Sequence, residues 1–354
     1  MKHGGDIYNN RVELDFSVNL NPLGTPDEIT AAIRHAQERI SCYPEYTQNT
    51  VRRMIGAALQ LDPASVYAGS GASELLMAAV RALHSKKALL FEPAFSGYAH
   101  ALAGTDCEIV RHLLKEENAF ALTKGDLTAL TKDIDLVFVC DPANPTGANV
   151  RDEVLTELLS RAAQNHTAVI LDESFFPLSD QAHDNGKGQA AGDRADTLTK
   201  EFENLIILRS LTKLFAIPGI RAGYVIASPD FIRRLTAQLP EWNLSVAAEE
   251  AIRAGMEVLS KTDFTEQSIR MIQTERAYLA ATLRECGLTV YESQAPYLLF
   301  AGPDDLYEKL LQQGILIRAC SDFYGLKKGT YRIAVRDHAD NEKLAGALRK
   351  ILCR

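Results

Sequence analysis

Three side chains that could act on one ligand follow each other closely in the middle of the chain: Ser210, Lys213 and Arg221. A short apolar strand is predicted over residues 205–208, and it runs into the turn that carries Ser210 and Lys213. Arg221 follows in a Pro-Gly-Ile-Arg-Ala-Gly segment, which cannot continue a helix. We therefore expect a hydroxyl, an amine and a guanidinium close together.

This combination predicts a site for pyridoxal phosphate (PLP). A lysine amine that is held out of water and near other cations has a lowered pKa, which Schiff-base chemistry with an aldehyde cofactor requires. Arg221 offers a planar fork of donors to phosphate oxygens, and Ser210 adds a hydroxyl. A lysine at a strand end is more often an exposed surface group, so the prediction depends on the whole pattern and not on Lys213 alone.

Other candidate residues also come directly after predicted strands. Gly71 ends a Gly-Ser-Gly turn before a helix that should open at Ala72, and the free amides of a helix N-terminus suit a phosphate. Asp172 follows the apolar strand 168–171, where a carboxylate is costly unless it finds a cation or a donor. Asn144 projects from a double-proline loop, and Phe95 could stack on a flat ring or belong to the core.

Two asparagines near the N-terminus, Asn19 and Asn21, lie in a polar run that is rich in turn residues. In extended backbone they would share a face and could point their amides at one ligand. A pair of Asx-turns is an equally good interpretation. A helix should follow over residues 27–40, with Thr25 as its N-cap and Pro26 at its first position.

These residues need a scaffold that brings strand ends together. The predicted strands alternate with helices, which requires a mainly parallel sheet with helices on both faces, and such sheets bind ligands at the carboxyl ends of their strands. We expect a large PLP-binding domain over residues 46–238, and a small domain formed by residues 1–45 and 239–354. The polar stretch 180–196 is expected to be an exposed or mobile loop.

Bulk composition excludes several classes of partner. A chain of 354 residues, 46% hydrophobic, can bury the cores of two domains. The net charge of -8 argues against a nucleic-acid partner, because no basic stripe can displace counterions from a phosphate backbone. No apolar run suits a membrane span or a signal region, so we expect a cytoplasmic protein. The six cysteines show no metal-ligand spacing, and no metal site is expected.

The Ser-x-x-Lys…Arg-x-Gly pattern resembles the PLP-lysine segment of fold-type I aminotransferases of class I and II, in the branch of histidinol-phosphate aminotransferases and threonine-phosphate decarboxylases. The similarity covers nearly the whole chain. It implies an α/β fold with a large, mainly parallel domain and a smaller α/β domain. It also implies that Lys213 forms the Schiff base, that Asp172 pairs with the pyridine nitrogen, and that Asn144 bonds the phenolic oxygen while Phe95 stacks on the ring. The residues that match phosphate contacts are Gly71, Ala72, Ser73, Ser210 and Arg221.

The resemblance also implies a homodimer, because Tyr43 matches a tyrosine that the other subunit donates. Where many relatives have a tyrosine after Asp-Glu-Ala, this chain has Phe175, which can offer no hydroxyl. The decarboxylase branch often shows phenylalanine there. The N-terminal His-Gly-Gly-Asp, the Asp-Phe-Ser-x-Asn-x-Asn-Pro-Leu-Gly run and the Arg-x-Cys-Ser-x-Phe motif also look like threonine-phosphate decarboxylases.

A substrate with both a carboxylate and a phosphate needs several fixed donors. Arg318, Arg332 and Arg336, with Asn19 or Asn21, could supply them, although each arginine could instead form an interdomain ion pair. The resemblance thus implies PLP-dependent decarboxylation of L-threonine O-3-phosphate to (R)-1-aminopropan-2-yl phosphate in cobamide (vitamin B12) biosynthesis. The alternative is a histidinol-phosphate or related aminotransferase.

Overall fold

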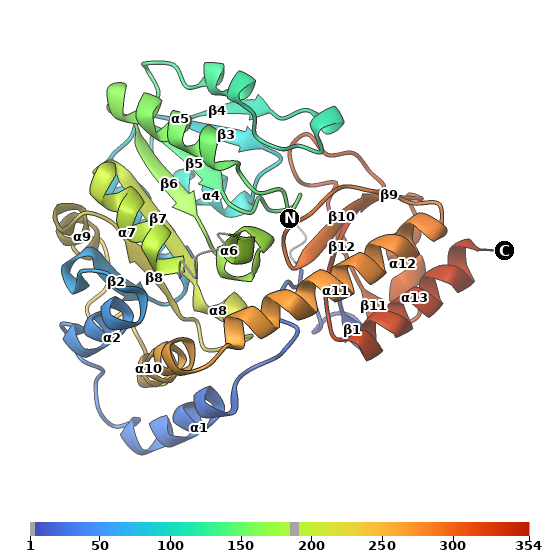
Figure 1. The fold of residues 1–354 in the computed structure, drawn as a ribbon, viewed down its shortest axis with the longest axis horizontal. Coiled ribbons are helices and arrows are strands. Elements are labelled where there is room, and N and C mark those ends of the chain that lie inside the picture. The colour runs from blue at the N-terminus through green and yellow to red at the C-terminus, as the bar shows by residue number, and fades with distance from the viewer. Residues whose placement is uncertain (1–3, 185–190, 354) are drawn as a thin grey trace.

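A seven-stranded sheet forms the centre of the larger part of the molecule (Figure 1). The computed structural model describes residues 4–184 and 191–353. The strand order is β2-β8-β7-β6-β5-β3-β4. Among these strands β8 alone runs in the opposite direction to the others. The strands are β2 (Val66–Gly69), β3 (Lys87–Glu92), β4 (Glu108–Leu113), β5 (Leu136–Cys140), β6 (Ala168–Asp172), β7 (Leu205–Ser210) and β8 (Gly223–Ile226). The predicted α/β class with a mainly parallel sheet is confirmed.

Helices cover both faces of this sheet, because alternate residues of a strand point to opposite faces. Val137 and Val139 face one apolar core, and Leu136 and Phe138 face the other. The first core is covered by α2 (Asn49–Leu59), α5 (Asp152–Gln164), α7 (Ala191–Glu201) and α10 (Val246–Lys261). The second is covered by α3 (Ala72–Leu83), α4 (Ser96–Leu102) and α9 (Pro229–Thr236). Because all strands of this sheet except β8 run in one direction, their carboxyl ends lie at one edge of the sheet.

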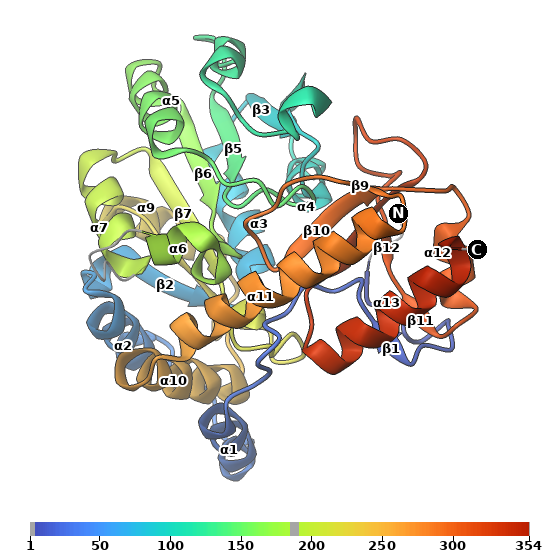
Figure 2. The ribbon, with the colours of Figure 1, turned by 45° about the vertical axis from the view of Figure 1, so that its right-hand side comes forward.

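A second unit is built on the antiparallel sheet β12-β13-β10-β9. Its strands are β9 (Thr289–Val290), β10 (Tyr297–Ala301), β12 (Arg318–Ala319) and β13 (Thr330–Ala334). Its helices are α11 (Phe264–Glu285), α12 (Leu306–Leu311) and α13 (His338–Leu352). Figure 2 shows α11 running from the neighbourhood of α10 to this unit.

The N-terminal segment contacts both parts of the molecule. Its strand β1 (Leu14–Asp15) pairs with β11 (Ile315–Leu316) beside the smaller sheet. Its helix α1 (Asp27–His35) packs against α10, and Ile29 belongs to the core of the large sheet. The division into residues 46–238 and the remainder stays a prediction.

Two local expectations were wrong. Thr25 does not cap α1: its hydroxyl donates to the carbonyl of Ala216 at 3.1 Å, and Pro26 occupies the N-cap position. The stretch 180–196 is not simply a loop, because it contains α6 (Asp180–Asp184) and the start of α7. Asp180 pairs with Arg276, and Ala195 is fully buried. Because small and charged residues make these contacts, the sequence shows little apolar periodicity here. Residues 185–190 of this stretch lie outside the described part of the chain.

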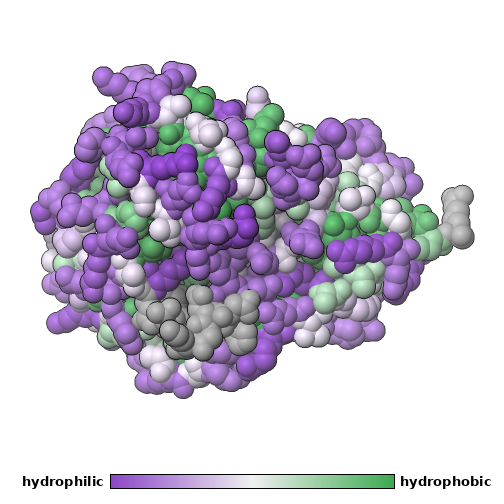
Figure 3. Space-filling view, turned by 45° about the horizontal axis from the view of Figure 1, so that its top comes forward, coloured by the Kyte–Doolittle hydropathy of each residue, from purple (hydrophilic) through white to green (hydrophobic). Residues whose placement is uncertain are grey.

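None of the helices in the described part of the chain is both long and apolar enough to cross a membrane. The same residues contain no group of three His, Cys, Asp or Glu that could hold a metal ion. Figure 3 shows a surface on which hydrophilic residues predominate and hydrophobic ones form separate small patches.

Candidate active site

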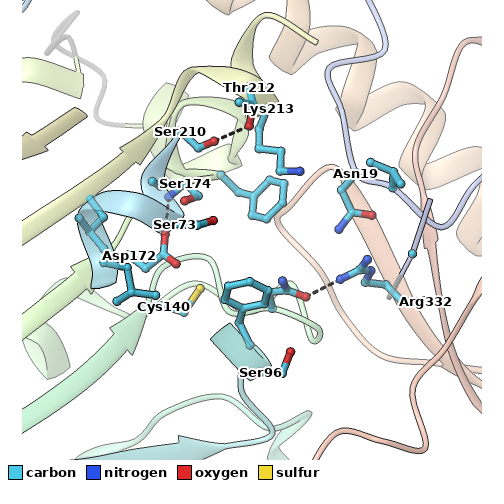
Figure 4. A pocket seen from close by; sticks show the side chains of 18 of the residues that line it. Asn19, Ser73, Ser96, Cys140, Asp172, Ser174, Ser210, Thr212, Lys213 and Arg332 are labelled. Atoms are coloured by element: carbon cyan, nitrogen blue, oxygen red, sulfur yellow. Dashed lines mark hydrogen bonds between the residues drawn. The ribbon is translucent and has the colours of Figure 1, made fainter. Parts of the chain in front are cut away.

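A cavity of about 270 Å³ lies at the carboxyl ends of β5, β6 and β7. Figure 4 shows Asp172 and Arg332 on opposite sides of this space, with Lys213 pointing between them. The structure thus brings together residues from the large sheet, the N-terminal segment and the smaller sheet. The predicted residues that line the cavity are Asn19, Ala72, Ser73, Phe95, Asn144, Asp172, Ser210, Lys213, Arg221, Arg318 and Arg332.

Lys213 lies in the single turn α8 (Leu211–Leu214), which begins where β7 ends. Burial, which has the largest effect, and the nearby positive charges of Arg332 and Arg221 together lower the pKa of its amine to about 8. Its Nζ lies 6.0 Å from the centre of the Phe175 ring, which offers no hydroxyl. An appreciable fraction of the amine is therefore neutral near pH 8, and a neutral amine can attack a carbonyl carbon.

Asp172 is the last residue of β6 and only 8% exposed. Burial raises the pKa of this carboxyl, while hydrogen bonds from the hydroxyl of Ser174, the hydroxyl of Tyr98 and the backbone N–H of Ser174 act in the opposite direction. Oδ1 accepts from the backbone N–H of Ser174 at 3.0 Å, and Oδ2 accepts from the hydroxyl of Tyr98 at 2.8 Å. Neutral donors, and not a cation, thus provide the partners that a buried carboxylate requires at this position. Tyr98 was not a candidate; the signal would have been its hydroxyl on the helix that follows Phe95.

The turn between β2 and α3 forms a cradle with Arg221. Gly71 has φ +81°, and a Cβ there would lie 2.6 Å from Nη2 of Arg221, so only glycine lets the guanidinium approach this closely. Gly71 does not line the cavity. The next residue, Ala72, begins α3 and does line it. The hydroxyl of Ser210 bonds that of Thr212 at 2.6 Å beside the same space.

The wall opposite Asp172 is positively charged. Arg332 donates to Oδ1 of Asn144 at 2.5 Å and to the carbonyl of Ser17 at 2.9 Å, while its buried Nε finds no partner among the described residues. Arg318 is held by both carboxylate oxygens of Asp322, at 2.8 and 3.0 Å. The buried Oδ1 of Asn19 also lacks a partner in the described chain. This wall offers unused hydrogen-bonding groups to a ligand.

Two predicted substrate residues do not reach the cavity. Asn21 donates to the carbonyl of Leu214 and to the hydroxyl of Ser268, and its Oδ1 accepts from the N–H of Leu23, as in an Asx-turn. Arg336 pairs with Asp340, with Nε and Nη2 at 3.0 and 2.9 Å. Asn21 thus follows the Asx-turn alternative, whereas Arg336 forms an ion pair within the smaller unit and not the interdomain pair that was the alternative for it.

Tyr43 also lies away from the cavity of its own chain. It is 77% exposed, and its ring lies 4.8 Å from that of Trp242. Residues that line the cavity without having been candidates are Gly4, Ser17, Val18, Leu76, Ser96, Cys140, Ser174, Phe175, Leu208, Thr212 and Phe323. Most of them are small or apolar, so their types alone carried no chemical signal.

Comparisons with known proteins agree with this geometry. Residues 11–348 match the family described as aminotransferase class I and II. Threonine-phosphate decarboxylase from Salmonella typhimurium is 34% identical over 344 residues, which are 96% of this chain and 91% of that protein. Both matches extend over nearly the whole chain.

Solved structures show the same architecture. Histidinol-phosphate aminotransferase from Clostridium acetobutylicum superimposes with a TM-score of 0.85 at 27% identity, over 96% of this chain and 98% of that one. The corresponding enzyme from Sinorhizobium meliloti, solved in complex with pyridoxal-5'-phosphate, gives 0.83 at 19% identity over 96% and 91%, which supports the fold alone. The chain therefore belongs to the aminotransferase class I and II family and is a PLP-dependent enzyme.

Proposed function

We propose that this enzyme decarboxylates L-threonine O-3-phosphate to (R)-1-aminopropan-2-yl phosphate in cobamide biosynthesis. One structural observation carries the proposal: two buried arginines, Arg318 and Arg332, face the cavity across from Lys213 and Asp172. Phosphothreonine carries two anionic groups, a carboxylate and a phosphate, and each can accept from a guanidinium. The 34% identity to a threonine-phosphate decarboxylase favours the same substrate.

The described residues fit PLP. When bound, PLP supplies an electron sink for negative charge at the substrate's α-carbon. We assign Asp172 to the ring nitrogen, because it is the one carboxylate in the described cavity lining. Asn144 can donate from its amide nitrogen to the phenolic oxygen, since its Oδ1 already accepts from Arg332. Phe95 provides an apolar face for the ring.

The cradle at the start of α3 is assigned to the cofactor phosphate. Its donors are the first amides of the helix, the hydroxyls of Ser73 and Ser210, and the guanidinium of Arg221. Lys213 would hold the cofactor through its aldehyde group, and its Nζ, free once substrate is bound, would be placed to return a proton to the substrate's α-carbon. These roles place the cofactor between the large sheet and the basic wall.

The basic wall is assigned to the substrate. Arg332 and Asn19 have unused groups that can receive the carboxylate or the phosphate, and Arg318 can receive the other anion. Asn21 and Arg336 are left out of this assignment because neither lines the cavity. A cytoplasmic location stays a prediction.

A homodimer completes the proposal. Tyr43, Tyr46 and Trp242 form an exposed aromatic cluster, in which the Tyr46 and Trp242 rings lie 5.3 Å apart. Single exposed aromatic residues are common, but three in contact indicate a surface that binds protein. We assign this surface to a second copy of the chain, with Tyr43 reaching the partner's cofactor.

A histidinol-phosphate aminotransferase is the second candidate, favoured by the TM-score of 0.85 to such an enzyme. One assay separates the two. The purified enzyme with PLP is given O-phosphothreonine, and CO2 release is measured; separately, histidinol phosphate and 2-oxoglutarate are supplied and glutamate is measured. We expect CO2 from the first mixture and little glutamate from the second. Glutamate formation without CO2 release would make the chain an aminotransferase.

A further inference from the structure

Tyr98 contacts Asp172 from behind the cavity. It lies in α4, is 1% exposed, and donates from its hydroxyl to Oδ2 of Asp172 at 2.8 Å. Tyr98 is not part of the cavity lining, so neither substrate nor cofactor can reach it directly. It can therefore influence the reaction only through the cavity residues that it contacts, and its hydroxyl donates to Asp172.

The ring of Tyr98 is fixed on two sides. It stacks on Phe138 of β5 with centroids 5.0 Å apart and planes at 21°, and the ring of Phe95 lies nearly perpendicular to it, with centroids 5.6 Å apart and planes at 88°. Such contacts in a close-packed interior leave no second position for the hydroxyl. The hydroxyl is therefore aimed at Asp172 before any ligand binds.

The charge on Asp172 depends on a small set of donors. In the described chain no cation lies within ion-pairing distance of it, and its donors are the hydroxyl of Tyr98 and the hydroxyl and backbone N–H of Ser174, all of them neutral. Burial favours the protonated carboxyl, and these bonds favour the ionised one. Burial also raises the pKa of Tyr98 well above its usual value, so the phenol keeps its proton and donates it.

We propose that Tyr98 is a positioning residue that keeps Asp172 ionised and oriented toward the PLP ring nitrogen, and thereby keeps the shared proton on that nitrogen. This inference rests on the proposed role of Asp172. An ionised carboxylate stabilises a protonated ring nitrogen, whereas a carboxylate that has lost a donor takes the proton back. With the proton on Asp172, the ring withdraws electrons less strongly.

The test uses Tyr98→Phe, which removes one oxygen and keeps the stacked ring. Tyr331→Phe is the matched control, because Tyr331 is 2% exposed and its hydroxyl donates to the carbonyl of Pro303 at 2.7 Å, in the core of the smaller unit. Each holoenzyme is prepared with PLP labelled with ¹⁵N in its ring. We expect the ¹⁵N chemical shift of Tyr98→Phe to move toward that of the unprotonated ring, and that of the control to stay at the wild-type value.

Turnover provides a second readout. Losing a hydrogen bond to a charged group should lower kcat by about 10- to 100-fold while KM stays within about 2-fold. In an Asp172→Asn background the same substitution should add little, because Tyr98 acts through that carboxylate. Losses that multiply, or a wild-type ¹⁵N shift in Tyr98→Phe, would overturn the inference and leave Tyr98 as a packing residue.

Two further measurements keep the outcome clear. If Tyr98→Phe does not fold, 3-fluorotyrosine at position 98 provides a more acidic donor of nearly the same shape. It should shift the ¹⁵N signal toward the protonated ring, and no shift would count against the inference. If Asp172→Asn alone has wild-type turnover and a wild-type ¹⁵N shift, the proposed role of Asp172 is wrong, which is a different failure.

Discussion

The amine of Lys213 acquires its reactivity from two neighbours and from burial. Arg332 comes from the smaller sheet and Arg221 from the segment before β8, and both positive charges disfavour the protonated amine. A lysine at an ordinary strand end would still be almost fully protonated at pH 8. The residue type was visible in the sequence, but its pKa depends on residues that only the fold brings near.

Lys213→Ala should abolish the visible absorbance of bound PLP that borohydride removes. The reason is that Lys213 is the one lysine lining the cavity within the described residues. Absorbance spectra before and after borohydride check this, with exposed Lys328→Ala as the control. A reducible chromophore that persists in Lys213→Ala would move the bond to another amine.

The lowered pKa of Lys213 also predicts a pH-dependent stability. The unfolded chain holds this proton up to a pH near 10.5, and the folded chain releases it near 8. Below pH 8 both states are charged, so the cost of burying the charge is fully present; it disappears as the pH rises from about 8 to 10.5. Lys213→Met should therefore stabilise the PLP-free protein at pH 7 by about 1–3 kcal/mol.

Urea unfolding of the PLP-free wild type and of Lys213→Met, at pH 7 and at pH 10.5, measures this difference. The gain from methionine should shrink toward zero at the higher pH. A gain that stays constant over this range would show that Lys213 is not buried as a charge. Comparing the two proteins at each pH cancels the titration of other groups.

Two arginines of the small unit, Arg332 and Arg336, make a graded prediction. Arg332→Ala should lower kcat/KM for phosphothreonine by about 30- to 1000-fold, because a charge-assisted contact to the substrate is lost. Arg336→Ala should cost much less, since its partner is Asp340 and not the cavity. Steady-state kinetics on both variants check the order. A larger loss in Arg336→Ala would restore the substrate role that its motif suggested.

At the scale of elements, strand ends were the most reliable guide. Apolar runs bounded by turn residues located β3, β5, β6 and β7, and parallel pairing then required Phe95, Asn144, Asp172 and Lys213 to meet at one edge. The sequence alone did not indicate that β8 runs antiparallel or that Arg336 turns to Asp340. The direction of β8 depends on pairing between distant segments, which local patterns do not encode. The Arg336–Asp340 pair is local, and its spacing of four residues permits an ion pair without requiring one.

The turn before α3 makes a prediction of its own. Gly71→Ala should weaken PLP binding by about tenfold or more, because alanine disfavours φ +81° and its Cβ would displace the guanidinium of Arg221. Fluorescence titration of the PLP-free protein measures the affinity. Gly104→Ala is the control, since a Cβ there meets no atom within 4 Å. Equal affinities of the two variants for PLP would show that the cradle does not bind the cofactor.

At the scale of the whole molecule, the dimer can be tested by complementation. If Tyr43 serves the partner's site, Tyr43→Ala and Lys213→Ala should each be impaired as homodimers. Mixed dimers of the two would contain one intact site, so a refolded equal mixture should recover about a quarter of wild-type activity. No recovery would mean that Tyr43 acts, if at all, within its own chain. Light scattering should give twice the chain's 38.9 kDa.

The two walls of the cavity come from different stretches of the chain. The groups assigned to PLP lie between Gly71 and Arg221, apart from the partner's tyrosine, whereas the substrate wall joins Asn19 to Arg318 and Arg332 from near the two termini. During synthesis of the chain, all the residues assigned to PLP are therefore translated before Arg318 and Arg332, which are assigned to the substrate. The same separation lets mutations near the chain ends alter substrate preference while the stretch that holds the cofactor is inherited unchanged. Enzymes of this family can in this way diverge in substrate without losing their shared chemistry.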